Sequence, residues 1–77
     1  MTQLEWKKTF GDNLNAILQD FGMSQSELAR ETGLSSSRIS DYINGHAAPS
    51  VFALINMAYI LDVDMNDFID FGERITL

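Results

Sequence analysis

Apolar residues recur along this chain with the spacing of amphipathic helices. In the N-terminal part they fall at i, i+4, i+7, i+8 and i+11, namely at Phe10, Leu14, Ile17, Leu18 and Phe21. This spacing places them on one face of an α-helix. The pattern predicts that the helix starts near Leu4 and ends at Gly22, because glycine readily takes the left-handed conformation that follows a helix.

Residues that favour helix ends mark the next two helices. Ser24 is followed three residues later by Glu27, which is the pattern of a capping box, and Gly33 ends this second helix after two turns. Ser35 can cap a third helix, which Gly45 ends in the left-handed conformation. The apolar face of the third helix is formed by Ile39, Tyr42 and Ile43.

Two more helices are predicted toward the C-terminus. Pro49-Ser50 opens the fourth, whose apolar stripe is formed by Val51, Leu54, Ile55, Ala58 and Leu61 and widened by Phe52 and Met57. Asp64 can cap the fifth, with Val63 and Phe68 at the spacing of a hydrophobic staple. No segment has the alternation of a strand, so we predict an all-α fold. It forms one domain over residues 1–77, with a core at about 4–71 and a short tail at 72–77.

The stretch from Ser24 to Asn44 resembles the helix-turn-helix of the phage repressor and Cro type. The matching residues are Gln25, Leu28, Ala29, Gly33, Leu34, Ile39 and Tyr42. Further matches extend the likeness to residues 10–70, at Asn44-Gly45, Pro49-Ser50, Leu54, Met57-Ala58, Leu61, Val63 and Phe68. The resemblance implies a five-helix, lambda-repressor-like DNA-binding domain, in which a recognition helix at about 36–43 enters the major groove.

The spacing of this motif also has a physical explanation. Two helices that cross over a short turn come closest near Ala29, where only a small side chain fits. Gly33 supplies the positive φ that lets the chain reverse. Because the apolar residues pin one face of the third helix, its opposite face presents Ser36, Ser37, Ser40, Asp41 and Asn44. A helix with small polar side chains outward has a shape that a major groove admits.

The resemblance implies DNA contacts for the exposed residues of the motif. The start and outer face of the third helix would read base edges through Ser35, Ser36, Ser37, Ser40 and Asp41. Arg38 is the strong donor in reach of guanine or phosphate. Gln25, at a helix N-terminus, matches a phosphate-contacting glutamine, and Asn44 and His46 would contact the DNA backbone. Alternatively, the serines are caps and solvated surface, and Arg38 pairs with Asp41 or Asp12.

Charge changes this picture. Eleven Asp and Glu against five Lys and Arg give a net charge of −6, whereas phosphate binding favours clustered cations. Counting Lys, Arg, Asp and Glu, residues 1–49 carry six acids and four bases, and residues 50–77 carry five acids and one base. The loop that follows the Asn-Gly pair is His46-Ala47-Ala48 rather than basic. An alternative function is therefore an acidic protein-interaction module that keeps the fold without tight DNA binding.

A second motif lies near the C-terminus. Residues 62–73 resemble a calcium-binding EF-hand loop, with Asp62, Asp64 and Asn66 at its start and Glu73 at the twelfth position. The turn glycine of that loop is replaced by Asp67, and only a few residues follow for an exiting helix. Calcium binding is thus a weaker alternative than DNA binding.

Composition excludes other classes of protein. The chain has no cysteine and one histidine, which leaves no nucleophile–base pair, and 77 residues do not form a deep substrate cleft. We therefore expect neither an enzyme nor a cofactor. No apolar run approaches the ~20 residues that span a bilayer. We expect a cytoplasmic regulator, bacterial or phage-encoded, that acts as a homodimer on a two-fold DNA operator, because one short helix reads few base pairs.

Overall fold

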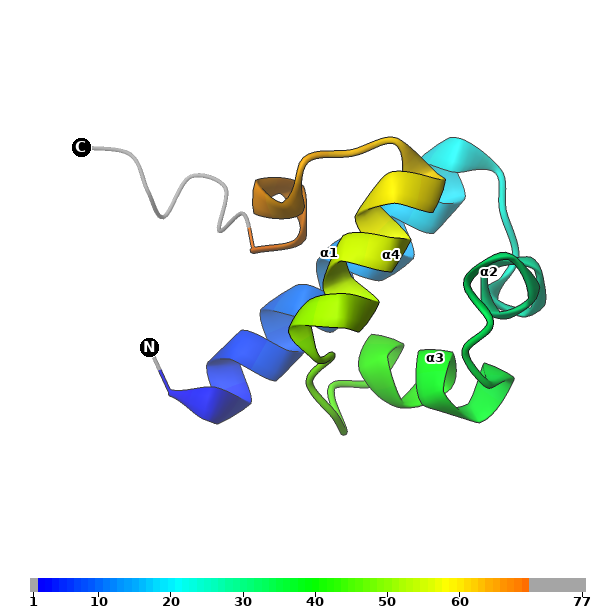
Figure 1. Ribbon diagram of the computed structural model, residues 1–77. Coiled ribbons are helices and arrows are strands. Elements are labelled where there is room, and N and C mark those ends of the chain that lie inside the picture. Colours follow the sequence, from blue (N-terminus) through cyan, green and yellow to red (C-terminus); the bar gives the residue numbers. More distant parts are fainter. Residues whose placement is uncertain (1, 70–77) are drawn as a thin grey trace.

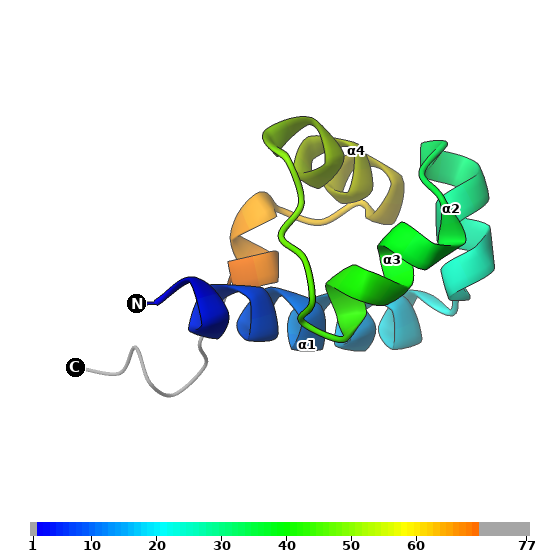
Figure 2. The ribbon, with the colours of Figure 1, turned by 90° about the horizontal axis from the view of Figure 1, so that it is seen from below.

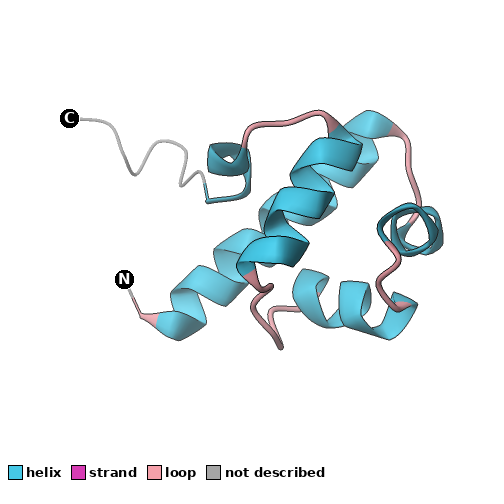
Figure 3. Cartoon of the chain, viewed as in Figure 1, coloured by secondary structure: helices cyan, strands magenta, loops and turns pink. Residues whose placement is uncertain are grey.

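A computed structural model describes residues 2–69 of the chain (Figure 1). The helical elements are α1 (Gln3–Phe21), α2 (Gln25–Thr32), α3 (Ser36–Ile43), α4 (Val51–Leu61) and the short 3-10 helix η1 (Met65–Ile69). This part of the chain contains no strand (Figure 3). None of its helices is both long and apolar enough to cross a membrane. The all-α prediction is confirmed.

Serine hydroxyl groups cap the N-terminal ends of three of the four α-helices in residues 2–69, as the sequence predicts. The hydroxyl groups of Ser24, Ser35 and Ser50 each accept a hydrogen bond of 3.1 Å from the backbone N–H three residues on. The carboxylate of Glu27 accepts in turn from the backbone N–H of Ser24, at 3.0 Å. These bonds to Ser24 stabilise the charged carboxylate, so they hold the pKa of Glu27 below its usual value. They satisfy N–H groups that a helix start leaves without partners.

The helices enclose one core. Figure 2 shows α1 along one side of the molecule and α4 along the opposite side, with α3 in front of the space between them. α1 packs against α3 and η1, and α2 packs against α3 and α4. The ring of Phe10 lies 5.9 Å from that of Tyr42 and 5.4 Å from that of Phe68, measured between centroids. The other buried apolar side chains are Leu14, Leu18, Leu28, Ala29, Ile39, Ala53, Met57, Ala58 and Leu61.

The fifth predicted α-helix is a 3-10 helix, so the five-helix fold is corrected, over residues 2–69, to four α-helices and η1. Asp64 caps this element as predicted, because its Oδ1 accepts from the N–H of Asn66 at 3.0 Å. The carboxylate of Asp67 accepts from the N–H of Asp64 at 3.1 Å. Short Asp and Asn side chains compete for backbone groups in this way, which favours a tight turn over a continued α-helix.

These contacts also bear on the calcium hypothesis for residues 62–73. Asp64 and Asp67 are bonded to the local backbone, and Asp62 adopts the left-handed conformation that ends α4, with φ of 55°. Among residues 2–69, no three His, Cys, Asp or Glu side chains group as a metal site would require. The predicted twelfth ligand, Glu73, lies outside the described residues. The described part of this segment is thus the end of one helix and the start of the next.

The apolar stripe predicted for α4 is partly wrong. Val51, Phe52 and Ile55 are exposed, at 72%, 74% and 50% of their surface, whereas Ala53 and Met57 are buried. α4 contains no charged residue and is apolar almost all round, so periodicity could not identify the buried face. Its contacts with α2, α1 and η1 determine which face enters the core.

Candidate nucleic-acid interface

α2, the turn at Gly33 and α3 form the helix-turn-helix unit. Gly33 has φ of +77°, a conformation that suits glycine, and it ends α2 as predicted. From α4, the side-chain amide of Asn56 donates a 2.8 Å hydrogen bond to the carbonyl of Thr32, the last residue of α2. Ile39 and Tyr42 are buried beneath α3. These contacts hold α3 at the surface with one face outward.

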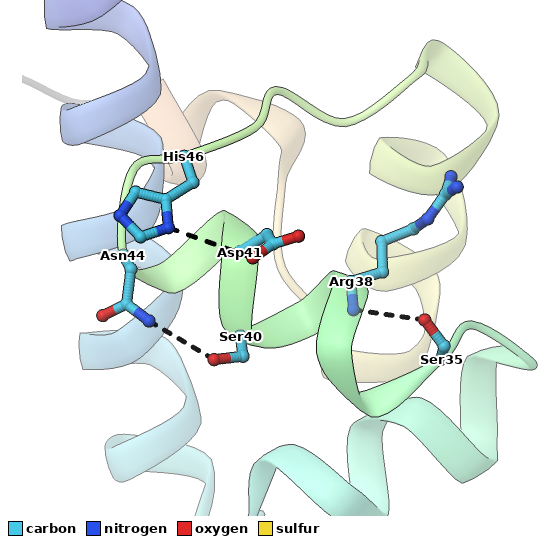
Figure 4. Close-up of polar contacts among 6 residues, drawn as sticks. All are labelled: Ser35, Arg38, Ser40, Asp41, Asn44 and His46. Atoms are coloured by element: carbon cyan, nitrogen blue, oxygen red, sulfur yellow. Dashed lines mark hydrogen bonds and ion pairs between the residues drawn. The ribbon is translucent and has the colours of Figure 1, made fainter.

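The structure brings most of the predicted site residues together on α3 and the turn after it. Ser35, Ser36, Ser37, Arg38 and Asp41 are exposed, and Ser40 is half-buried. Figure 4 shows the side chains of Ser35, Arg38, Asp41 and His46 arranged along α3 and the segment that follows it. Gln25 is exposed as well, but it belongs to a different helix, where it is the first residue of α2.

Arg38 extends away from Asp41 (Figure 4). Within residues 2–69, no ion pair joins Arg38 to a carboxylate, so neither of the surface pairs considered for it, with Asp41 or with Asp12, is formed. The guanidinium group is free to meet an anion. Beside it, a shallow hollow of about 370 Å³ separates α3 from the loop before α4, lined by Ser35, Ser37, Arg38, Asp41, Ala47 and Ala48.

Two polar pairs occupy the C-terminal end of α3. Nδ1 of His46 lies 3.9 Å from Oδ1 of Asp41, and both side chains are exposed. The side-chain amide of Asn44 donates a 3.3 Å hydrogen bond to the hydroxyl of Ser40 (Figure 4). His46 thus lies beside the acidic side chain of the outer face of α3.

The tertiary structure adds a basic element that sequence reasoning missed. A Cβ atom built on Gly45 would lie 3.5 Å from the Cα of Lys8, so α1 passes directly beside the turn after α3. Lys8 is exposed and Lys7 is half-buried. Lys7 and Lys8 therefore place two positive side chains on the part of α1 that passes this turn, between the exposed carboxylates of Glu5 and Asp12. No local signal in the sequence links positions 8 and 45.

Gly11 is a second residue whose role the sequence did not indicate. It lies inside α1 and is buried. A Cβ atom at this position would overlap the carbonyl oxygen of Tyr42 and lie 2.6 Å from that of Ile43. The absence of a side chain therefore allows α1 to approach the C-terminal end of α3 closely, which sets the position of α3. The sequence feature that could have indicated this contact is a glycine inside a helical pattern.

Comparison with known proteins agrees with this geometry. The fold is similar to that of the restriction-modification controller protein C.AhdI from Aeromonas hydrophila, with a TM-score of 0.77 and 26% identity, over 80% of this chain and 94% of that one. An HTH_3 family transcriptional regulator from Vibrio cholerae has a TM-score of 0.85 and 20% identity over 96% of this chain, which spans 42% of that regulator. The clp gene regulator ClgR from Corynebacterium glutamicum has a TM-score of 0.78 and 22% identity, over 82% of this chain and 67% of that one.

Sequence comparison identifies the family. No curated protein sequence matches the chain significantly. The model of the HTH_3 helix-turn-helix family matches residues 14–68, which extend from the middle of α1 into η1 and include all of α2, the turn and α3. The matched region is more than half of the chain and contains the elements that support α3. This chain belongs to the HTH_3 helix-turn-helix family.

Proposed function

We propose that this chain is a sequence-specific DNA-binding regulator of transcription whose α3 enters the major groove. The observation that carries the proposal is the outer face of α3, which presents small polar side chains and Arg38, while Ile39 and Tyr42 anchor the helix beneath. Arg38 forms no ion pair with any carboxylate of residues 2–69. Small outward side chains let a helix approach base edges closely. C.AhdI is a restriction-modification controller protein, and ClgR and the Vibrio cholerae protein are regulators, which supports this function.

The proposal includes a homodimer on a two-fold operator. α3 has eight residues, and a helix of this length contacts only a few base pairs, so two copies are needed for a specific site. We further propose that the regulator acts in the cytoplasm, is bacterial or phage-encoded, and has no catalytic activity of its own. Base contacts are assigned to Ser35, Ser36, Ser37, Arg38, Ser40 and Asp41, and backbone contacts to Gln25, Asn44 and His46.

The small number of cations beside α3 predicts the salt dependence of binding. Arg38 lies on this surface, Lys7 and Lys8 lie on the part of α1 beside it, and Arg30 is exposed on α2 of the same helix-turn-helix unit. Each neutralised phosphate contributes about −0.9 to the slope of log affinity against log salt. We expect a slope on the order of −2 to −4 per domain, measured by retardation of DNA fragments between low and physiological salt.

The first variant to test is Arg38→Ala. If Arg38 binds a guanine, its loss should cost about 1–3 kcal/mol on the preferred site and relax the preference at that base. If it binds only phosphate, affinity should fall alike on all sequences and the salt slope should lose about one unit. Titration of wild type and variant on one pool of DNA fragments distinguishes these results.

Asp41→Asn is the matched variant for the same titration. It removes a negative charge from the presented face, so nonspecific affinity should rise while the fold is kept, because this side chain is exposed. If wild type, Arg38→Ala and Asp41→Asn all fail to retard DNA at low salt with the helices intact, DNA binding is ruled out. The acidic protein-interaction module would then be the better function.

Lys8→Ala tests the contribution of α1. The loss of this charge beside the turn at Gly45 should lower affinity by the same factor on specific and random DNA and reduce the salt slope by about 0.9. Asn66→Asp is the control, because it changes the net charge by the same amount on exposed η1. Equal effects of the two variants would show that only the total charge matters and that Lys8 contacts no phosphate.

A further inference from the structure

Another hollow adjoins the segment that connects α3 to α4. Its volume is about 250 Å³, and it is lined by Gln3, Trp6, Lys7, Ala48 and Pro49. The first three of these residues belong to the start of α1, and the other two belong to the connecting segment, residues 44–50. Figure 2 shows this segment running from beside α1 across to α4. We call this hollow the Trp6 pocket.

The aromatic wall of the Trp6 pocket is held in a defined position. The indole of Trp6 is half-buried and stacks on the ring of Phe10, with centroids 5.6 Å apart and 13° between the ring planes. Phe10 is itself fully buried in the core. A wall that is already in place favours a flat, apolar ligand, because aromatic contacts add to the gain from burial of apolar area.

The charge of the Trp6 pocket favours an anion. Lys7 is half-buried and forms no ion pair with any carboxylate of residues 2–69. Glu5, two residues earlier, accepts hydrogen bonds from the N–H and the hydroxyl of Thr2, at 3.1 and 3.0 Å. Although the chain carries eleven Asp and Glu, no carboxylate of residues 2–69 lines this pocket. Gln3 and Trp6 add side-chain N–H donors to the ammonium group.

We propose that the Trp6 pocket binds a small organic acid that consists of an aromatic ring and a carboxylate. The ring lies against Trp6 and Pro49, and the carboxylate meets the ammonium group of Lys7. Sites for drug-sized ligands have volumes of about 300–1,000 Å³. The Trp6 pocket is smaller than these sites, so its ligand has a single ring.

The bound acid would weaken DNA binding, a consequence that rests on the proposed function. Lys7 lies on the part of α1 that passes the turn at Gly45, and Ala48 lines both the Trp6 pocket and the shallow hollow beside Arg38. A carboxylate on Lys7 would neutralise a charge that is otherwise available to a phosphate. DNA and the acid would therefore lower each other's affinity by the same factor.

The first experiment follows the fluorescence of Trp6, the single tryptophan of the chain, during titration with phenylacetate in the absence of DNA. We expect a saturable change with a dissociation constant of about 1 mM or below for a ligand of this size. Acetate lacks the ring and phenylacetamide lacks the charge. At the same ionic strength, each should bind at least about tenfold more weakly than phenylacetate.

Lys7→Gln tests the contact with the carboxylate. It should weaken the binding of phenylacetate at least about tenfold, because the charge-assisted hydrogen bond is lost. Gln19→Glu is the charge-matched control, since it lowers the net charge by the same amount at an exposed position of α1, about 18 Å further along the helix. Its affinity for phenylacetate should equal that of wild type within about twofold. Circular dichroism should show the same helix content in both variants.

The second experiment repeats the salt titration of DNA binding in saturating phenylacetate. The acid should lower the affinity for DNA and reduce the salt slope by about 0.9, the contribution of one phosphate contact. Acetate at the same concentration should change neither quantity. In the Lys7→Gln variant, phenylacetate should leave the affinity for DNA unchanged.

The outcomes separate this inference from the proposed function. A fluorescence change that does not saturate, or equal affinities for phenylacetate, phenylacetamide and acetate, overturns the Trp6 pocket as a site for an organic acid. An unchanged affinity in Lys7→Gln overturns it as well. Selective binding of phenylacetate by a chain that does not retard DNA supports the site and contradicts only the DNA-binding function. Selective binding that leaves the affinity for DNA unchanged supports the site and overturns its effect on DNA.

Discussion

Ile39→Ala is expected to lower the free energy of unfolding by about 2–5 kcal/mol. Ile39 is fully buried in the core, on the inner face of α3. Truncation removes apolar contacts and leaves a cavity, which the neighbouring helices fill only in part. Small domains have a total stability of about 5–15 kcal/mol, so this loss is a large share. Urea unfolding followed by circular dichroism measures it.

Two comparisons make the Ile39 result specific. Ile39→Val removes one methylene and should cost only about 0.5–1.5 kcal/mol. Leu4→Ala removes apolar atoms from an exposed position and should stay within about 0.5 kcal/mol of wild type. All variants should be compared at one protein concentration, because dimer formation would add to apparent stability. An Ile39→Ala chain as stable as wild type would mean that α3 presents a different face to the core.

Gly11→Ala should destabilise the fold although alanine is the better helix former. The gain in helix propensity is about 1 kcal/mol. The added methyl group would overlap backbone oxygens at Tyr42 and Ile43, which cannot rotate away as a side chain can. α1 and α3 must then separate, so we expect a net loss of about 1–3 kcal/mol. Thermal unfolding measures this loss, and DNA affinity at a temperature where the variant is folded shows whether α3 has moved.

Gly22→Ala is the control for this variant. Gly22 caps the C-terminal end of α1, with φ of +80°, and a Cβ atom added there would contact no other part of the described chain. Alanine there meets only the conformational cost of the left-handed region, about 1–2 kcal/mol. It should lower stability without affecting DNA affinity. If Gly11→Ala raised the melting temperature, the close approach of α1 and α3 would be wrong.

Helix boundaries were largely predictable because their causes are local. A Ser hydroxyl two or three residues before an N–H group, or a glycine after the last turn, acts within one turn of chain. Ser24, Ser35 and Ser50 cap as predicted, and Gly33 and Gly45 are left-handed. The same reasoning indicated that Asp64 begins an element. It did not distinguish an α-helix from the 3-10 helix that short polar side chains favour there.

The outer face of α3 was predictable for a related reason. The apolar residues of this short helix occupy one side, so the exposed side follows from its period. The sequence indicated an outer face of Ser36, Ser37, Ser40, Asp41 and Asn44, and all of these are exposed except Ser40, which is half-buried. Their DNA contacts remain predictions, to be tested by the variants above.

The amino-acid sequence by itself determined the all-α class, the places where helices begin and the polar face of α3, because each depends on neighbours within a few residues. Only the tertiary structure decided which side of α4 is buried, since that helix is apolar almost all round and its partners select the face. The tertiary structure also decided that α1 packs closely against the end of α3 at Gly11 and that Lys8 lies beside Gly45. These contacts join residues more than thirty positions apart in the sequence. No local sequence pattern indicates how closely two helices pack.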